Sequence, residues 1–391
     1  MTIAQSTNGP WIDHIPGNGL WSNAILVTKG MAPYGAVALG EIDQVCEKLR
    51  ARQSEPHAWW EEWRAMGRRL HARADLLEAA GHRMSAGNYF LRAGMYYFTA
   101  ERFIYPGPDK REMGRMAIDC QTKGILRRHQ NVARVEVPFE GKSLPAFFMK
   151  ALNTNAARAP TIVVFNGMDN CKEMSVLFAG LEFAARGWNT LAIDGPGQGE
   201  SLRLRELYAR HDYEVAGTAA YDYVAAREDV DAAKVFVMGY SFGGYYAARV
   251  AAFEKRYCGG IAMSALHWDL HGWQRDIKRR QDADPKGTPQ SAFHFRWIMG
   301  CIDDAEAALE KAKQFSLAGV AEKITCPFII VHAGEDTVVP VANAPKLFDA
   351  IASKDKQLKI LNAEDGGHYH AQADNRQVGI DYIADWVEKH V

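Results

Sequence analysis

Residues 235–249 read Val-Phe-Val-Met-Gly-Tyr-Ser-Phe-Gly-Gly-Tyr-Tyr-Ala-Ala-Arg, and this stretch decides the fold. A short apolar run passes through Gly239-Tyr-Ser-Phe-Gly243 into an alanine-rich run typical of a helix. A serine between two glycines at such a junction predicts a nucleophile elbow, because the turn leaves no room for a Cβ at either glycine. We therefore expect Ser241 to stand at the N-terminus of a helix, where developing negative charge is favoured.

The composition limits the classes of partner. The chain has 391 residues, 48% of them hydrophobic, and a formal net charge of -1. Its length suits one large α/β domain with an addition, or two domains. The charge gives no global attraction to nucleic acid or to anionic membranes, and no stretch is long and apolar enough to span a bilayer. We expect a cytoplasmic protein with a small-molecule substrate and neither nucleic acid nor membrane as partner.

The cysteine and histidine patterns argue against a disulfide framework and a metal site. Six cysteines are scattered without a CxxC pair, and thirteen histidines include no HExxH motif. The glycine-rich loop Asp194–Ser201 lacks the spacing of a phosphate-binding loop, so we interpret it as a structural turn. The sequence predicts no metal and no cofactor.

The first part of the chain has a helical pattern. Residues 1 to about 35 show no clear periodicity and predict an irregular arm. Apolar residues then recur at helical spacing in four segments, which predicts an all-helical domain over residues 1–130 that covers the site, mediates dimerisation, or does both. The predicted helices are Glu41–Arg52, His57–Ala80, Ser85–Phe103 and Arg111–Arg128.

From about Val132 the pattern changes to strands that alternate with helices. Two alternating runs predict a β-hairpin, and six short apolar runs after it predict strands joined by helices. This is the pattern of an α/β protein, with a mostly parallel, doubly wound sheet over residues 131–391 and an antiparallel start. A helical insertion at about 266–321 is expected to help cover the site. The hairpin strands are Val132–Phe139 and Leu144–Ala151, and the later strands are Thr161–Phe165, Thr190–Asp194, Val235–Met238, Gly260–Ser264, Phe328–Ala333 and Gln357–Leu361.

A serine nucleophile needs a base, and the base needs a carboxylate to orient it. Asp336 follows the strand at 328–333, and His368 follows the next strand, so both are expected at strand C-terminal ends. The order Ser, Asp, His is that of α/β-hydrolases. Glu335 and His370 are the competing residues. We favour Asp336 because it precedes a Val-Val-Pro segment, and His368 because it follows two glycines.

The oxyanion formed on attack needs two fixed N–H donors. One is expected from Phe242, directly after the nucleophile. The other is expected from Met168, in the loop after the strand at 161–165, with Gly167 allowing the close approach.

These motifs resemble a known family. The elbow, the Asp194–Gly199 loop, Gly334–Asp336 and Gly367-His368 are similar to the α/β-hydrolase motif set over about residues 132–391. The preceding helical segment makes the chain resemble the family that contains 2,6-dihydroxypseudooxynicotine hydrolase, the fungal polyketide-shortening hydrolases of the yellowish-green pigment pathway and the fermentation-respiration switch esterase.

The resemblance implies a Ser241, Asp336, His368 triad, no cofactor, a homodimer, and hydrolysis of a C–C bond next to a ketone in an aromatic or polyketide-like substrate. It also implies an auxiliary acid after the sixth core strand, for which Asp269, His267 and His271 are candidates.

Two other functions fit the same residues. A carboxylesterase, lactonase or acyltransferase would use the same triad, because ester and C–C cleavage share one acyl-enzyme. A hydrolase-derived binding protein would keep the pocket, although it would not need the complete triad and oxyanion positions.

Overall fold

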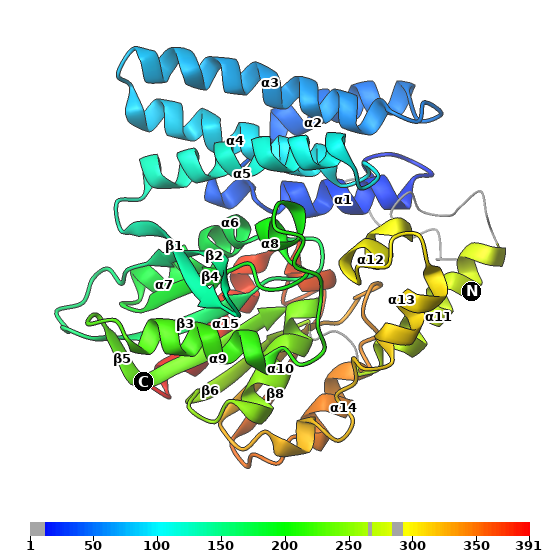
Figure 1. Cartoon of the computed structure of the whole chain (residues 1–391). Coiled ribbons are helices and arrows are strands. Elements are labelled where there is room, and N and C mark those ends of the chain that lie inside the picture. Colours follow the sequence, from blue (N-terminus) through cyan, green and yellow to red (C-terminus); the bar gives the residue numbers. More distant parts are fainter. Residues whose placement is uncertain (1–11, 265–267, 284–291) are drawn as a thin grey trace. The chain divides into compact units, whose positions relative to one another are not determined.

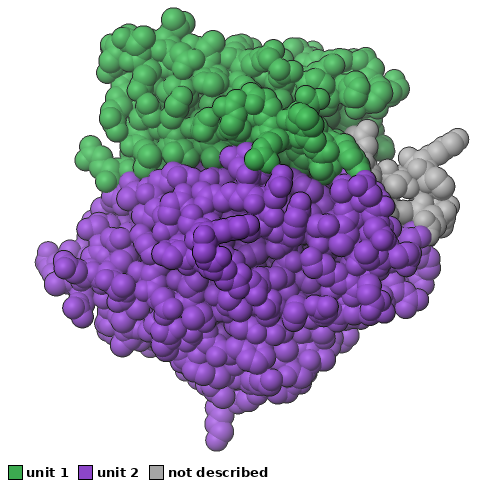
Figure 2. All heavy atoms as spheres, viewed as in Figure 1, with its two compact units in different colours: residues 1–130, 289–291 green, residues 131–288, 292–391 purple. Residues whose placement is uncertain are grey.

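The computed structural model describes residues 12–264, 268–283 and 292–391. The chain separates into two compact units, and the boundary between them falls between Gln130 and Asn131 (Figure 2).

The N-terminal unit is built of helices, as its periodicity predicts. The helices α2 to α5 match the four predicted segments to within three residues at each end. Helices α3, α4 and α5 follow one another as long antiparallel neighbours (Figure 1) and bury an aromatic core in which Trp59, Trp63 and Tyr96 are fully covered. The bounds are α2 Leu39–Ala51, α3 Ala58–Ala79, α4 Arg83–Glu101 and α5 Pro108–Arg128.

The expectation of an irregular arm before residue 35 is wrong for its second half. Helix α1 (Gly19–Lys29) and the 3-10 turn η1 (Ala32–Tyr34) occupy it. The side chain of Asn18 accepts a hydrogen bond from the Trp21 N–H and begins the helix. Six residues of α1 are buried on several sides, so its apolar residues do not form a single stripe that periodicity could detect.

The second unit contains one sheet of eight strands in the order β1-β2-β4-β3-β5-β6-β7-β8. Strands β1 and β2 are antiparallel and β2 joins β4 antiparallel, whereas all pairs from β4 to β8 are parallel. The prediction of a mostly parallel sheet with an antiparallel start is confirmed. The strands are β1 Val132–Phe139, β2 Lys142–Met149, β3 Ala159–Phe165, β4 Asn189–Ile193, β5 Val230–Tyr240, β6 Gly259–Met263, β7 Phe328–Ala333 and β8 Lys356–Leu361.

Helices lie on both faces of this sheet (Figure 1). Strands β3, β4, β6 and β7 and residues 235–240 of β5 are almost wholly buried, as parallel strands covered on both faces must be. Their carboxyl ends meet at one edge, where the loops after β3, β5, β6 and β7 come together. The main covering helices are α9 Glu214–Ala225, α10 Phe242–Phe253, α14 Asn343–Ala350, α15 Arg376–Glu388 and the continuous segment formed by α6 Lys172–Ser175, η2 Val176–Gly180 and α7 Leu181–Ala185.

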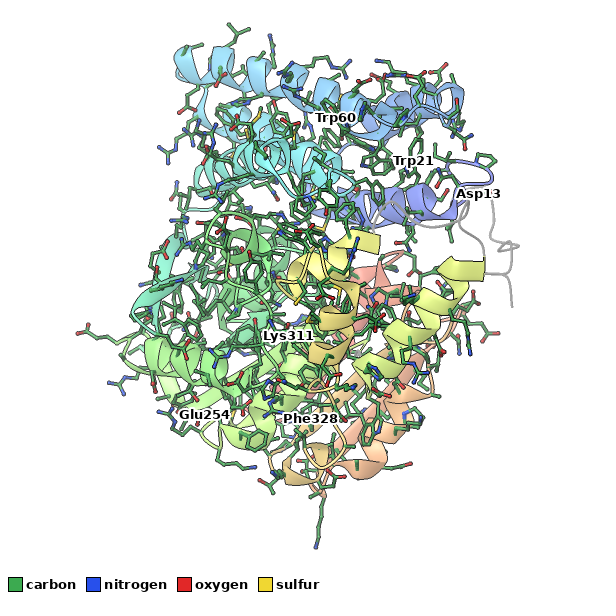
Figure 3. The ribbon with its side chains drawn as sticks, turned by 45° about the vertical axis from the view of Figure 1, so that its right-hand side comes forward. Asp13, Trp21, Trp60, Glu254, Lys311 and Phe328 are labelled. Atoms are coloured by element: carbon green, nitrogen blue, oxygen red, sulfur yellow. The ribbon has the colours of Figure 1, made fainter. Side chains whose placement is uncertain are left out.

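The insertion after β6 is helical where it is described. It contains α11 (Leu270–Ala283), α12 (Ala292–Ile298) and α13 (Ala305–Ala312). Lys311, labelled on α13 in Figure 3, donates a hydrogen bond to the Met299 carbonyl at 2.7 Å and so ties α13 to the end of α12. None of the helices within residues 12–264, 268–283 and 292–391 is long and apolar enough to cross a membrane.

Candidate active site

Ser241 lies in the strained turn that the sequence predicts. Its backbone has φ 55° and ψ −125°, a conformation rare for a residue with a side chain, between β5 and α10. A Cβ placed on Gly239 would lie 1.8 Å from the Gly243 carbonyl oxygen, so this turn accepts only glycine there. The Ser241 N–H donates to the Met263 carbonyl of β6 at 2.9 Å, which fixes the turn to the sheet. Ser241 is half-buried.

A chain of hydrogen bonds joins Ser241 to an imidazole and a carboxylate. The Ser241 Oγ lies 2.8 Å from Nε2 of His370, and the Nδ1 of the same ring lies 2.7 Å from Oδ2 of Asp336. A carboxylate only accepts, so Nδ1 carries the proton and Nε2 presents its lone pair to the hydroxyl. This arrangement can take the proton of Ser241 and make its oxygen a nucleophile.

Asp336 is held as an ionised acceptor. Its Oδ1 accepts the N–H groups of Val338 and Val339 at 2.9 and 2.8 Å, and its side chain is fully buried. Burial alone would raise the pKa of Asp336, but the positive charge and hydrogen bond of His370 outweigh it, and the net pKa is lowered. Burial lowers the pKa of the neighbouring His332, whose Nε2 lies 3.7 Å from Oδ2, so this second imidazole stays neutral.

The expectation that His368 serves as the base is wrong in this structure, because His370 occupies that place. The carboxylate of Asp374 accepts the N–H groups of His368 and Tyr369 at 3.2 and 3.1 Å, and the His368 carbonyl accepts the Glu335 N–H at 2.9 Å. The His368 ring lies beside Asp374, with Nδ1 3.2 Å from its Oδ2. These bonds hold His368 away from Ser241 and let the chain continue to His370. Glu335, the other competing residue, does not replace Asp336.

Ser264, at the end of β6, positions the loop that carries His370. Its hydroxyl oxygen accepts the Ala371 N–H at 3.1 Å and the Gln372 side-chain amide at 3.3 Å, and all three residues have positive φ. Ser264 is fully buried. The sequence does not predict this role of Ser264, because nothing about a lone serine after a strand indicates which backbone groups it will bind.

The loop after β3 lies against the nucleophile. A Cβ on Gly167 would lie 2.9 Å from the Ser241 Cβ, so the backbone of this loop passes directly beside the serine. The Gly167 carbonyl accepts the Asn170 N–H at 3.5 Å, and since the peptide is trans, the Met168 N–H of the same peptide group points the opposite way. Met168 and Phe242 stay the predicted oxyanion donors.

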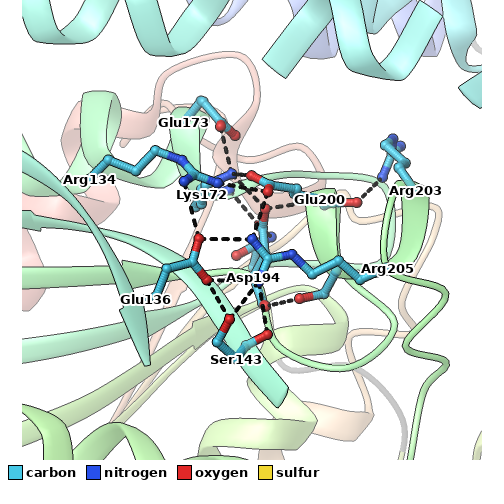
Figure 4. A network of polar contacts seen from close by, with 12 residues as sticks. Arg134, Glu136, Ser143, Lys172, Glu173, Asp194, Glu200, Arg203 and Arg205 are labelled. Atoms are coloured by element: carbon cyan, nitrogen blue, oxygen red, sulfur yellow. Dashed lines mark hydrogen bonds and ion pairs between the residues drawn. The ribbon is translucent and has the colours of Figure 1, made fainter. Parts of the chain in front are cut away.

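A buried charged network binds the residues on either side of this loop (Figure 4). Asp194 is fully buried, and its Oδ1 accepts the Asn166 side-chain amide at 2.8 Å and the Lys172 N–H at 2.7 Å. The Gln198 amide donates to the Asn166 carbonyl. The loop Asp194–Ser201 is therefore structural, as expected, and it fixes the residue just before Gly167.

Lys172 is the centre of the network. Its fully buried ammonium lies 2.7 Å from Glu173, 2.9 Å from Glu200 and 3.2 Å from Asp194. Burial works against the charge of Lys172, but the three carboxylates outweigh it and raise its pKa. Burial would raise the pKa of Glu200, but Lys172 and two arginines lower it to about 2. The two arginines are Arg134 and Arg205, each donating to Glu200 Oε1 (Figure 4).

The candidates for an auxiliary acid are not brought to one place. Asp269 is exposed, and its Oδ1 accepts the Gly272 N–H at 3.0 Å, as a residue that caps helix α11 does. His271 is half-buried in the same helix, and His267 lies outside the described residues. A different histidine, His294 of α12, lies 2.6 Å from Asp169 at the end of the loop beside Ser241. Within the described ranges, no three metal-binding side chains gather into a group.

Comparison with known proteins agrees with this fold. The model of the prolyl oligopeptidase family matches residues 182–391, which contain Ser241, Asp336 and His370. The hydrolase LUC6 of Fusarium sp is 27% identical over 88% of this chain and 90% of the relative. The 20-hydroxy-prefusarin hydrolase FUS2 of Gibberella moniliformis is 26% identical over the same shares of the two chains.

The solved structures extend the likeness to the whole chain. The crystal structure of 2,6-dihydroxy-pseudo-oxynicotine hydrolase superimposes with a TM-score of 0.76, covering 93% of this chain and 95% of that chain at 21% identity. The structure of AbyA5 gives a TM-score of 0.67 over 90% and 91% at 19% identity. The resemblance seen in the sequence is confirmed, and this chain belongs to the prolyl oligopeptidase family of α/β-hydrolases.

Proposed function

We propose that this hydrolase cleaves a C–C bond next to a ketone, in a β-diketone or an aromatic, polyketide-like substrate, through an acyl-enzyme on Ser241. The observation that carries the serine mechanism is the chain of hydrogen bonds from the Ser241 hydroxyl through His370 to Asp336. The substrate class rests on the resemblance to hydrolases of this kind and on the relative FUS2, a 20-hydroxy-prefusarin hydrolase.

In this mechanism Ser241 attacks the ketone carbonyl carbon while Nε2 of His370 takes the hydroxyl proton. The oxyanion accepts hydrogen bonds from the Phe242 and Met168 N–H groups. When the intermediate collapses, the electron pair of the C–C bond stays on the leaving carbon as an enolate, and His370 returns the proton to it. A water molecule, deprotonated by His370, then hydrolyses the acyl-enzyme and releases the acid.

The decisive experiment is product analysis by mass spectrometry with aromatic β-diketones and matched esters in ¹⁸O-labelled water. We expect the wild type to convert a diketone into a labelled acid and an unlabelled ketone. Ser241→Ala should produce neither while keeping the wild-type melting temperature and losing reaction with a fluorophosphonate probe. If only esters are cleaved, the protein is a carboxylesterase, lactonase or acyltransferase and not a C–C hydrolase. If the wild type does not react with the fluorophosphonate probe, a binding protein is favoured.

The homodimer, the covering role of the helical N-terminal unit and the cytoplasmic location are proposals that rest on the resemblance and the sequence. Sedimentation velocity of the full chain at several concentrations tests the first. A species at the mass of one chain at all concentrations would reject the dimer.

A further inference from the structure

His294 and Asp169 form a second imidazole–carboxylate pair, and Asp169 belongs to the loop that passes beside the nucleophile. The Nε2 of His294 lies 2.6 Å from Oδ1 of Asp169 and 3.4 Å from the Met168 carbonyl oxygen. His294 comes from α12 in the insertion, whereas Asp169 and Met168 belong to the loop whose Gly167 touches Ser241. Two segments distant in the sequence therefore form this pair, and its carboxylate belongs to the residue directly after the predicted oxyanion donor Met168.

The other ring nitrogen of His294 is unsatisfied. Only 9% of the His294 side chain is exposed, and its Nδ1 is buried without a hydrogen-bond partner among the described residues. A buried polar atom without a partner costs free energy, so such atoms call for an explanation. The pair resembles that of His370 and Asp336, in which the carboxylate binds one ring nitrogen and the other nitrogen is left for a reacting group.

The tautomer follows from the partners. Because both the Asp169 carboxylate and the Met168 carbonyl only accept, Nε2 must carry a proton. In the imidazolium form Nδ1 carries one as well and can donate to an oxygen of the ligand. Asp169 supplies the negative charge that balances this form.

We propose that His294, oriented by Asp169, donates a hydrogen bond from Nδ1 to the second carbonyl oxygen of the substrate, the oxygen that becomes the enolate oxygen of the leaving fragment. This inference rests on the proposed function and adds the group that recognises a 1,3-dicarbonyl. As the C–C bond breaks, negative charge moves onto that oxygen, so the hydrogen bond strengthens during the reaction. His294 donates this hydrogen bond without transferring its proton. The proton that the leaving carbon receives is the one that His370 took from Ser241.

The test compares two leaving groups that share one acyl group: a β-diketone and its matched nitrophenyl ester, which has no carbonyl in its leaving group. His294→Ala should lower kcat for the diketone by about 10²-fold or more, the loss typical of one oxyanion donor. It should change kcat for the ester by no more than a few-fold. Asp169→Asn should lower diketone turnover by a smaller factor, and added imidazole should restore part of the diketone activity of His294→Ala. His390→Ala, which removes an imidazole paired with Asp355 at 3.0 Å outside the active site, is the matched control and should leave turnover of both substrates unchanged.

Equal losses on both substrates would overturn the proposal, since His294 would then only hold the oxyanion loop in place. No loss on either substrate would overturn it as well. An enol ester of the same diketone separates this inference from the proposed function, because its C–O cleavage releases the same enolate. If the wild type cleaves the esters but no diketone, the C–C function fails. A loss selective for the enol ester in His294→Ala would still support His294, and a wild type inert to all three substrates would reject both.

Discussion

The Nδ1 of His370 lies 2.7 Å from Oδ2 of Asp336, and both groups are fixed from outside the pair. Two backbone N–H groups after Asp336 hold its other oxygen, and Ser264 holds the backbone just after His370. A carboxylate and an imidazole fixed in this way need little reorganisation when the ring accepts a proton. The geometry before the reaction is thus already the geometry that the proton transfer requires.

The first prediction follows from this pair. His370→Ala should lower kcat by roughly 10⁴-fold or more, because removing the base of such a triad costs about as much as removing the nucleophile. The readout is hydrolysis of an activated aryl ester together with the rate of fluorophosphonate labelling.

His368→Ala is the matched control, two residues away on the same loop. It should keep kcat within a few-fold of the wild type, because its ring faces Asp374 and not Ser241. Inactivation by His368→Ala together with an active His370→Ala would reverse the assignment.

The sequence predicted Ser241 and Asp336 of the triad but not His370, and the reason is physical. Ser241 directly follows β5 and Asp336 lies three residues beyond β7, so the strands themselves bring both residues to the carboxyl edge of the sheet. His370 lies nine residues beyond the end of β8, in a loop shaped by Asp374, Ser264 and positive φ values at Ala371 and Gln372. These contacts come from elsewhere in the fold. A sequence with two histidines two residues apart therefore predicts which loop carries the base but not which of the two imidazoles it is.

The same distinction explains what was predicted of the fold. Strands β3, β4, β6 and β7 and the second half of β5 are mostly apolar runs, and α2 to α5 have helical spacing, so the local sequence pattern was sufficient to predict them. Helix α1 is buried on several sides and has no such stripe. His294 could not be recognised either, because its partner Asp169 lies 125 residues earlier in the sequence. Only the folding of the insertion brings the two side chains together.

The second prediction concerns Ser264. Ser264→Ala removes the acceptor of two hydrogen bonds next to His370, so it should lower kcat roughly tenfold with little change in KM, and destabilise the protein by about 1–3 kcal/mol. Steady-state kinetics and urea unfolding measure the two effects. Ser353→Ala removes a buried hydroxyl that bonds to the Asp355 carbonyl outside the site, and it should leave kcat unchanged. An unchanged kcat in Ser264→Ala would show that the serine does not position His370.

The third prediction concerns the buried ammonium of Lys172. Lys172→Met removes the cation shared by Glu173, Asp194 and Glu200, so it should destabilise the protein by about 3–5 kcal/mol, as loss of one partner from a buried ion pair does. The measurement is chemical unfolding at pH 7. Arg186→Ala breaks the solvent-exposed pair with Asp381 and should cost no more than about 1 kcal/mol. Similar losses in the two variants would mean that the network contributes no more than a surface ion pair.

The fourth prediction is the pH dependence of stability. Burial, helped by Lys29 for His14 and by Arg128 for His129, lowers the pKa of each of these two histidines from 6.5 to about 4. Below pH 6.5 the unfolded chain binds protons that the folded chain does not, so stability is present at pH 7 and is lost as the pH falls toward 4. After allowance for solvent screening, we expect each histidine to account for a loss of about 1 kcal/mol between pH 7 and pH 5.

Urea unfolding at pH 7, 6 and 5 measures this loss. The double variant His14→Gln, His129→Gln keeps two neutral polar side chains that gain no proton on unfolding, so its stability should change less over this range. His82→Gln alters an exposed ring of the same unit and should leave the wild-type pH dependence unchanged. If the double variant loses as much stability on acidification as the wild type, the loss comes from other groups and the two buried histidines are not its source.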